Sequence, residues 1–97
     1  MTFSFEWDPA KAALNLKKHG VSFDEAATVF SEWGAPIDSD PLHSVEEERF
    51  IIIGRSESQR VLTVVFTFRD ETTIRIISAR RSTNRERRTY EQEKRVD

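Results

Sequence analysis

The stretch RVLTVVFTFRDETTIRIISARR, residues 60–81, decides the fold, because it holds two runs of β-branched and aromatic residues on either side of the polar turn RDE. A similar run lies at residues 50–53, ahead of a polar turn at residues 54–59. Three short strands joined by tight turns predict consecutive antiparallel pairing. Residues 50–53 and 64–66 are apolar without alternation, so we expect the sheet to be covered on much of both faces.

The chain before these strands predicts one more strand and a helix. The segment TFSFEWD, residues 2–8, alternates aromatic and polar side chains, as a half-buried strand does. Asp8 as N-cap, Pro9 in the first turn and Gly20 after the last turn then delimit a first helix.

A capping box at Ser22 and Glu25 opens a second helix, which we expect to end at residues 33–34. Residues 35–45 contain two prolines, Pro36 and Pro41, and several polar or acidic residues, which predicts a surface loop with room for a short strand near Ile37. The middle of the chain therefore links the helices to the strands over the surface.

The C-terminal end predicts one more helix. Thr83 and Glu86 form another capping box, which opens a helix expected from about residue 84 to about residue 95, with Tyr90 as its only large hydrophobic residue. The expected fold is a single α+β domain, residues 1–97, in the order β-α-α-β-β-β-α. Two N-terminal helices pack on an antiparallel sheet of about four strands, and a basic helix ends the chain.

An acidic body carries a basic C-terminal quarter. Residues 1–74 contain 7 Lys or Arg and 13 Asp or Glu, net −6, whereas residues 75–97 contain 8 and 4, net +4. Such an asymmetry is typical of a face that binds a polyanion. A solvated helix with internal ion pairs gives the same count, and the sequence leaves both interpretations open.

Composition excludes several classes of protein. Without cysteine the chain has neither a disulfide framework nor a thiolate zinc site, so we expect a reducing compartment, the cytoplasm. The longest apolar run, residues 50–53, is far shorter than the ~20 residues of a membrane span, and no signal-peptide pattern follows Met1. We expect no metal and no cofactor, because no cluster of histidines and carboxylates has metal-ligand spacing.

The last predicted strand ends in arginines that regular alternation separates. Counting by twos puts Arg75 on the side of Thr73, and Arg80 on the side of Ile74. Arg75 is therefore expected to point away from Arg80. The two can join one site only through a twist, a bulge or the end of the strand.

Several short motifs, spread over residues 5–90, resemble the BrnT family in sequence and order. They are FEWD at 5–8, Asn15 followed by KHG at 18–20, VSFDEA at 21–26, EER at 47–49, RVL at 60–62, and RIISAR at 75–80 with Arg85, Glu86 and Tyr90 behind it. The resemblance implies the toxin of a bacterial type II toxin–antitoxin pair, with a fold similar to RelE toxins. It also implies a metal-independent endoribonuclease that inhibits translation.

The same resemblance implies two partners. RNA is expected to bind against the sheet and its arginines. A cognate BrnA-like antitoxin is expected to neutralise the toxin in a hetero-oligomer. This complex is expected to bind DNA only through the antitoxin. The alternative is a non-catalytic basic module that docks a protein or a nucleic acid. RNA degradation by the purified protein in EDTA separates the two hypotheses.

RNA cleavage without a metal requires a base for the 2′-OH proton, an acid for the leaving 5′ oxygen, and cations for the charge of the transition state. The candidate catalytic residues are His19, Arg49, Arg75 and Arg80. Histidine suits proton transfer near neutral pH, although His19 fits equally well as a cap of the helix C-terminus. Arg80 ends a strand just before a helix, where a guanidinium can hold a phosphate with two hydrogen bonds. A surface ion pair with one of the glutamates at 46–48 is the alternative.

The candidate RNA-binding residues are Lys18, Arg81, Arg85 and Tyr90. Tyr90 suits stacking on a base, and it also suits a role as the anchor of the last helix on the core. The basic residues suit RNA phosphates or acidic groups of the antitoxin. A steep salt dependence of RNA affinity would indicate phosphate contacts.

Overall fold

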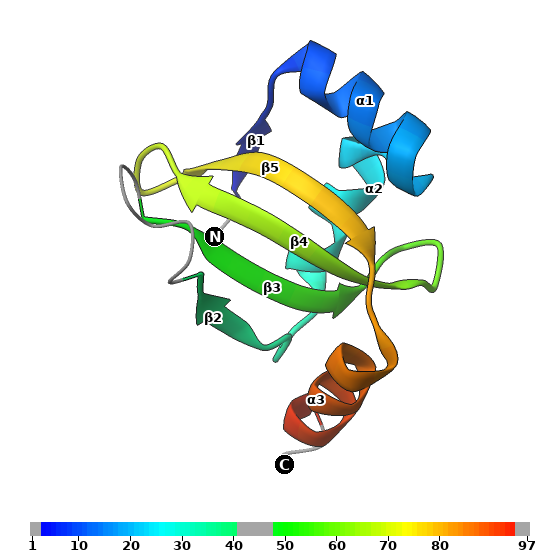
Figure 1. Cartoon of the computed structure of the whole chain (residues 1–97). Coiled ribbons are helices and arrows are strands. Elements are labelled where there is room, and N and C mark those ends of the chain that lie inside the picture. The colour runs from blue at the N-terminus through cyan, green and yellow to red at the C-terminus, as the bar shows by residue number, and fades with distance from the viewer. Residues whose placement is uncertain (1–2, 41–47, 95–97) are drawn as a thin grey trace.

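The computed structural model of the chain describes residues 3–40 and 48–94. The elements, in order, are β1 (Ser4–Glu6), α1 (Pro9–His19), α2 (Phe23–Thr28), the 3₁₀ helix η1 (Val29–Ser31), β2 (Ile37–Ser39), β3 (Phe50–Arg55), β4 (Val61–Phe68), β5 (Thr73–Arg81) and α3 (Asn84–Lys94) (Figure 1). The α+β class and the predicted order are confirmed, and the short strand near Ile37 adds a fifth strand. Glu46 and Glu47, two of the possible ion-pair partners of Arg80, lie outside the described residues.

The sheet is mixed, with the strand order β1-β5-β4-β3-β2. The four strands β2 to β5 pair in antiparallel fashion, as predicted. β1 pairs parallel to β5, with Glu6 opposite Arg75. This pairing departs from the predicted all-antiparallel sheet, because two helices and three strands separate β1 from β5 and no tight turn dictates the direction.

The N-terminal helices begin as their caps predict. The Asp8 carboxylate accepts the N–H of Ala10 at 2.8 Å, and Gly20 ends α1 in the left-handed region with φ 69°. The hydroxyl of Ser22 accepts the N–H of Glu25 at 3.0 Å and caps α2. α2 is shorter than predicted, since the chain tightens into η1 after Thr28.

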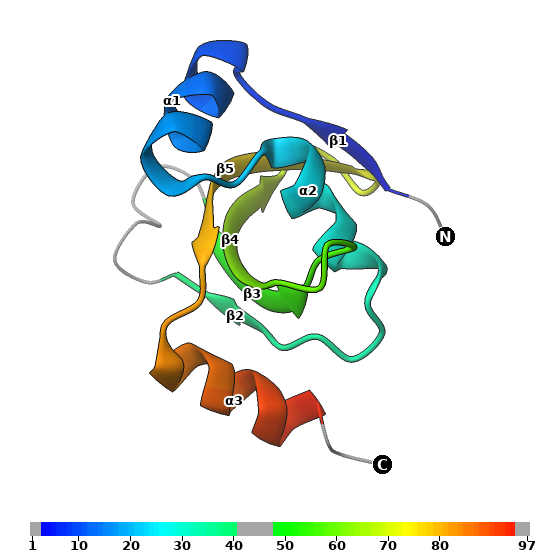
Figure 2. The same ribbon diagram turned by 90° about the vertical axis from the view of Figure 1, so that its right-hand side faces the viewer.

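One face of the sheet packs against α2 and η1 and forms the core (Figure 2). Its fully buried side chains come from β3, β4 and β5 and from the helical segment: Val21, Phe23, Ala26, Val29, Ile52, Leu62, Val64, Phe66, Ile74, Ile76 and Ala79. Phe66 lies at the centre, with the ring of Phe30 edge-on at 4.9 Å and the ring of Phe50 stacked at 5.6 Å.

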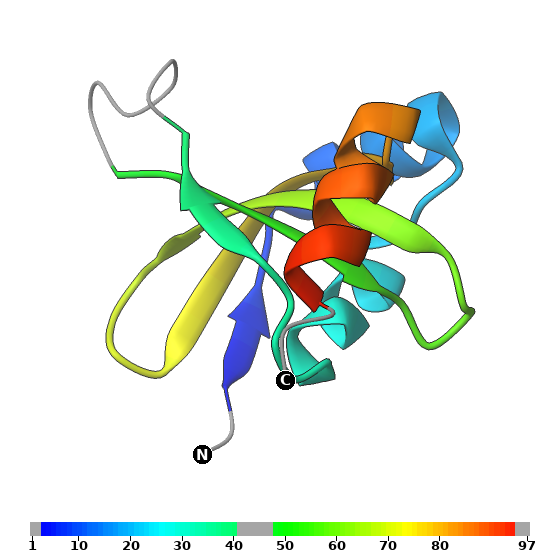
Figure 3. The ribbon, with the colours of Figure 1, turned by 90° about the horizontal axis from the view of Figure 1, so that it is seen from below.

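We call the opposite face the outer face; it carries the side chains of Ile51, Ile53, Thr63, Val65, Thr67, Arg75, Ser78 and Arg80. α3 lies on this side, and Figure 2 shows the sheet between α1 and α3. Figure 3, seen from below, shows α3 in front of the strands. Tyr90 anchors α3: its side chain is buried, and its hydroxyl donates to Glu32 at 2.6 Å. The rest of the outer face is half-buried or, at Thr63 and Thr67, buried within the sheet.

Candidate active site

β5 contains a β-bulge that brings two of the candidate arginines together. Val65 pairs with Ser78 while Phe66 pairs with Ile76, so that Ile77 is an extra residue in β5. After the bulge, the side chain of each residue of β5 points to the face opposite to the one that regular alternation predicts. Figure 1 shows β5 curving as it runs toward α3.

The consequence falls on Arg75 and Arg80. Arg75 pairs with Thr67 and Arg80 pairs with Thr63, and these threonines are four residues apart on β4, where the side chains share a face. Arg75 and Arg80 therefore both lie on the outer face, about 13 Å apart along the strand. The prediction that they point to opposite sides is wrong, because alternation counts the extra residue as a regular one.

Arg80 is held by Glu86 of α3. Its two terminal nitrogens donate to the two carboxylate oxygens at 2.8 and 2.9 Å, in the parallel geometry that suits a guanidinium. Glu86 also accepts from the N–H of Thr83 at 2.9 Å and from the hydroxyl of Thr63 at 3.0 Å. Burial raises the pKa of Glu86, but the hydrogen bonds from Arg80, Thr83 and Thr63 outweigh it and lower that pKa to about 2. Arg80 is thus fixed and charged, and Glu86 is ionised at neutral pH.

Arg75 is held by a second carboxylate, from β1. Its guanidinium donates to Glu6 at 2.8 Å, and Arg69 approaches the same carboxylate oxygen at 3.4 Å. The pairing of β1 with β5 places Glu6 directly opposite Arg75. Each side chain of the Arg75–Glu6 pair remains about one-third exposed, so the pair is open to a ligand from solvent.

Arg49, the residue before β3, is the third candidate arginine near the outer face. It directly precedes Phe50, which packs in the core, so alternation places Arg49 toward the outer face. Its carbonyl accepts the N–H of Asp40 at 2.8 Å and continues the β2–β3 ladder. The structure places Arg75 and Arg80 on one side of the sheet, and alternation from Phe50 puts Arg49 on the same side.

His19 and Lys18 reach the end of β5 from another direction. Asn15 is buried in α1 and binds the backbone of Ala79 twice: it donates to the carbonyl at 2.8 Å and accepts the N–H at 3.2 Å. It also donates to the carbonyl of Val21 at 3.0 Å. His19 follows Asn15 by one helical turn, so these bonds fix the last turn of α1 beside residues 79–81. His19 is half-buried there and Lys18 is exposed.

The remaining candidates lie apart from one another. Arg81 follows Arg80 but pairs with Leu62, which faces the core side, so Arg81 leaves the strand in the opposite direction. Arg85 is exposed on α3. Tyr90 is only 5% exposed and is bound to Glu32, which agrees with the anchor interpretation and leaves no ring face open for a base. Burial is the largest cause that raises the pKa of Tyr90.

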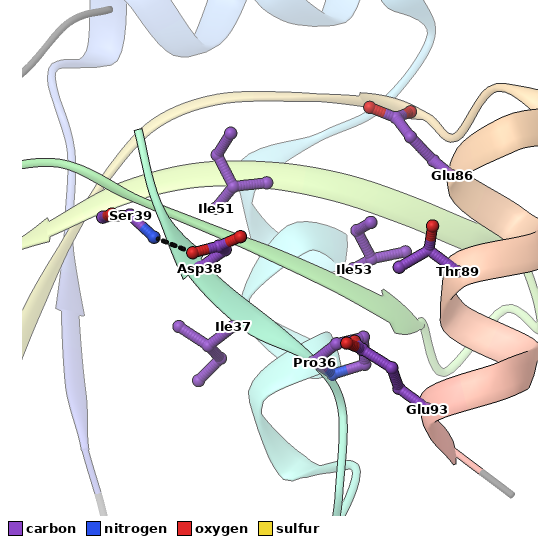
Figure 4. A pocket seen from close by; sticks show the side chains of 9 residues that line it. All are labelled: Pro36, Ile37, Asp38, Ser39, Ile51, Ile53, Glu86, Thr89 and Glu93. Atoms are coloured by element: carbon purple, nitrogen blue, oxygen red, sulfur yellow. Dashed lines mark hydrogen bonds between the residues drawn. The ribbon is translucent and has the colours of Figure 1, made fainter. Parts of the chain in front are cut away.

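A groove of about 230 Å³ lies on the outer face between β2, β3 and α3 (Figure 4). Ile51 and Ile53 form its apolar floor, and the carboxylates of Asp38, Glu86 and Glu93 lie around it. Figure 4 shows Glu86 and Glu93 reaching from α3 toward the strands. Glu86 is compensated by Arg80, but the carboxylates of Asp38 and Glu93 repel phosphate, so this groove suits apolar or cationic groups.

Two kinds of feature are absent from the described residues. No group of three His, Asp or Glu side chains in residues 3–40 and 48–94 is placed to hold a metal ion. Within the same residues, no helix has the length and apolar character that a membrane crossing requires.

Sequence reasoning missed three residues that organise this site: Glu6, Asn15 and Glu86. The capping-box pattern accounts for Glu86 only as a helix cap, although a carboxylate six residues after Arg80 was available as its partner. Asn15 and His19 are four residues apart in a helix and therefore lie on the same helical face. This spacing was the sequence signal that Asn15 supports the turn that carries His19. The sequence gives no sign that Glu6 binds Arg75, because the two residues are 69 positions apart.

Comparison with known proteins assigns the chain to a family. A search of curated proteins finds no match. Among solved structures, the chain is similar to the ribonuclease toxin BrnT of Brucella abortus, with a TM-score of 0.65 and 21% identity over 86% of this chain and 100% of that one. This likeness shows a shared fold. The sequence model described as "Ribonuclease toxin, BrnT, of type II toxin-antitoxin system" matches residues 7–86, most of the chain. The chain therefore belongs to the BrnT family of ribonuclease toxins of type II toxin–antitoxin systems.

Proposed function

We propose that this chain is a metal-independent endoribonuclease that cleaves RNA where the outer face meets the end of β5. The observation that carries the proposal is the bulge at Ile77, which puts Arg75 and Arg80 on one accessible face. The carboxylates of Glu6 and Glu86 fix both guanidiniums before RNA arrives. Each guanidinium has five N–H donors, so one edge remains for a phosphate after the carboxylate is bound.

The reaction follows from these groups. The 2′ oxygen of the ribose attacks the adjacent phosphorus, the bond to the 5′ oxygen breaks, and the products carry a 2′,3′-cyclic phosphate and a 5′-OH. One group takes the 2′-OH proton and another gives a proton to the leaving 5′ oxygen. Arg80 stabilises the negative charge on the phosphoryl oxygens of the cleaved phosphate. Arg75 lies about 13 Å along the strand, where it suits a neighbouring phosphate, and Arg49 is the next cation along the face.

His19 serves in this proposal as the proton carrier. Asn15 fixes the helical turn that holds it, beside the strand end that carries Arg80. Glu86 is unsuited to that role, because a carboxylate with a pKa of about 2 is a weak base near neutral pH. Glu86 therefore positions Arg80. A folded His19→Ala protein with unchanged cleavage would remove His19 from the proposal.

Lys18, Arg81 and Arg85 are the proposed RNA-binding residues around this centre. All three are exposed cations, and none of them makes an ion pair within the described part of the chain. Tyr90 was predicted to contact RNA; in this role it would have to leave its place on the core, so we assign it to the anchoring of α3.

The family also implies an antitoxin partner and an RNA target. We propose that RNA cleavage inhibits translation in the cytoplasm, and that a BrnA-like DNA-binding antitoxin neutralises the toxin in a hetero-oligomer. Copurification of both proteins, with loss of RNA cleavage on complex formation, is the expected result. Full cleavage by the complex would contradict neutralisation.

A non-catalytic basic binding module is the second candidate. One observation favours it: Arg75 and Arg80 both have carboxylate partners, as structural arginines do. Incubation of end-labelled RNA with the purified protein in excess EDTA separates the candidates. Ribonuclease activity predicts fragments with 2′,3′-cyclic phosphate ends that accumulate at undiminished rate in EDTA. RNA that is bound and remains intact would establish the binding module.

A further inference from the structure

A second cationic surface lies on the other side of the β5 end from Arg80. A groove of about 350 Å³ is lined by Gln59, Arg60, Val61, Arg81, Ser82 and Arg87. We call it the strand-end groove. Three of its six residues are arginines, contributed by the residue before β4, the end of β5 and the first turns of α3.

The three arginines differ in their partners. Arg60 is bound to the carboxylate of Glu25 and donates to the carbonyl of Gly20 at 3.1 Å, so it is fixed in the wall of the groove. The hydrogen bond from Arg60 is the largest cause that lowers the pKa of Glu25, and Ser56 adds to it. Arg81 and Arg87 are exposed, and neither side chain makes an ion pair with another described residue. The charge of Arg81 helps to lower the pKa of Glu25, but its exposed guanidinium, like that of Arg87, has no ion-pair partner among the described residues and can bind a ligand.

The groove also connects with the proposed active site. Arg80 and Arg81 are neighbours on β5 and leave it on opposite sides, so the strand end separates the outer face from the groove. The carbonyl that Arg60 binds belongs to Gly20, the residue after His19. An RNA strand that reaches His19 from the outer face can continue across the strand end into the groove. The arginines there attract the negative charge of its phosphates, and none of the described residues that line the groove is a carboxylate.

We propose that the strand-end groove is a phosphate subsite for single-stranded RNA, in which Arg81 and Arg87 each bind a backbone phosphate beyond the cleavage point and Arg60 supports the wall. This proposal rests on the ribonuclease function. Its ligand class is the RNA backbone, because guanidiniums without base-edge partners bind phosphates irrespective of sequence.

The test measures RNA binding as a function of salt, with a single-stranded probe that carries 2′-O-methyl groups and resists cleavage. Each phosphate contact on a single strand contributes about 0.7 to the slope of log affinity against log salt. The double variant Arg81→Gln/Arg87→Gln should therefore lose about 1.4 of that slope. The control Lys11→Gln/Arg88→Gln removes the same charge from exposed positions outside the groove and should keep the slope of the wild type.

The outcomes separate the subsite from the enzyme. Equal losses of slope in both double variants, or no loss in either, would overturn the subsite. Cleavage of the unmodified RNA by the wild type is scored in parallel. If the wild type fails to cleave while the groove variant alone loses slope, the ribonuclease proposal fails, and the groove is an RNA-phosphate binding site that is not part of an enzyme. Circular dichroism of both variants excludes unfolding as the cause.

Discussion

At the scale of single residues, Asn15 shows how a buried polar side chain links two elements. Its amide makes three hydrogen bonds to the backbone of Val21 and Ala79 and fills the place of a neighbouring strand at the edge of β5. An asparagine inside a helix has low intrinsic propensity, so this position is explained by its partners. The sequence supplies the residue but cannot show that its partner lies 64 positions further on.

We expect Asn15→Ala to lower the free energy of unfolding by about 2 to 3 kcal/mol, because buried backbone groups of Val21 and Ala79 lose their partners. Urea denaturation measures the change. Leu14→Ala is the matched control on the same helix, since Leu14 is 66% exposed and should change the value by less than about 0.5 kcal/mol. Equal effects of the two substitutions would contradict the bridging role of Asn15.

The low pKa of Glu86 predicts how the free energy of unfolding changes with pH. Its pKa in the folded state, about 2, lies below the ordinary value of 4.5, so the ionised form stabilises the fold. That contribution is fully present above pH 4.5 and is lost as the pH falls toward 2. The difference in unfolding free energy between wild type and Glu86→Gln should therefore shrink over this window. A difference that stays constant from pH 6 to pH 2.5 would show that the carboxylate charge does not stabilise the fold.

At the scale of elements, local signals predicted the helices well and β5 only in part. The caps at Asp8, Gly20, Ser22 and Thr83 all form as the sequence indicates, because each depends on residues within a turn of one another. The β-bulge in β5 depends on how β5 pairs with β4, which no local pattern encodes. For the same reason the candidate arginines could be named from the sequence, whereas their common face could not.

The anchoring of α3 rests on few contacts and is open to a direct test. Tyr90 is the helix's buried hydrophobic residue among those described, and its hydroxyl donates to Glu32. Tyr90→Phe removes that bond and should reduce hydrogen-exchange protection of the α3 amides roughly tenfold, with little change in the core strands. Glu91→Gln, at an exposed neighbouring position, is the control. Unchanged protection in Tyr90→Phe would mean that the ring alone holds the helix.

At the scale of the whole molecule, the acidic body and the basic C-terminal quarter meet at the end of β5. The acidic body supplies Glu6, which binds Arg75 of the basic quarter, whereas Glu25 binds Arg60 within the body itself. Arg81 and Arg87 of the basic quarter make no ion pair with another described residue. The charge count in the sequence left two interpretations open, a polyanion-binding face and a solvated helix with internal ion pairs. It could not show which arginines are bound by carboxylates and which are not, because these pairs join distant segments.

The central claim is that the arginines on the outer face cleave RNA without a metal. Single-turnover cleavage of a labelled RNA in excess EDTA, by wild type, Arg80→Lys and Arg88→Lys, tests it most directly. Arg80→Lys keeps the charge but loses the two-pronged geometry, so we expect the cleavage rate to fall by about 10²-fold or more while Arg88→Lys cleaves like the wild type. Full activity of Arg80→Lys, or a wild type that is inactive in EDTA and active with a divalent cation, would contradict the account.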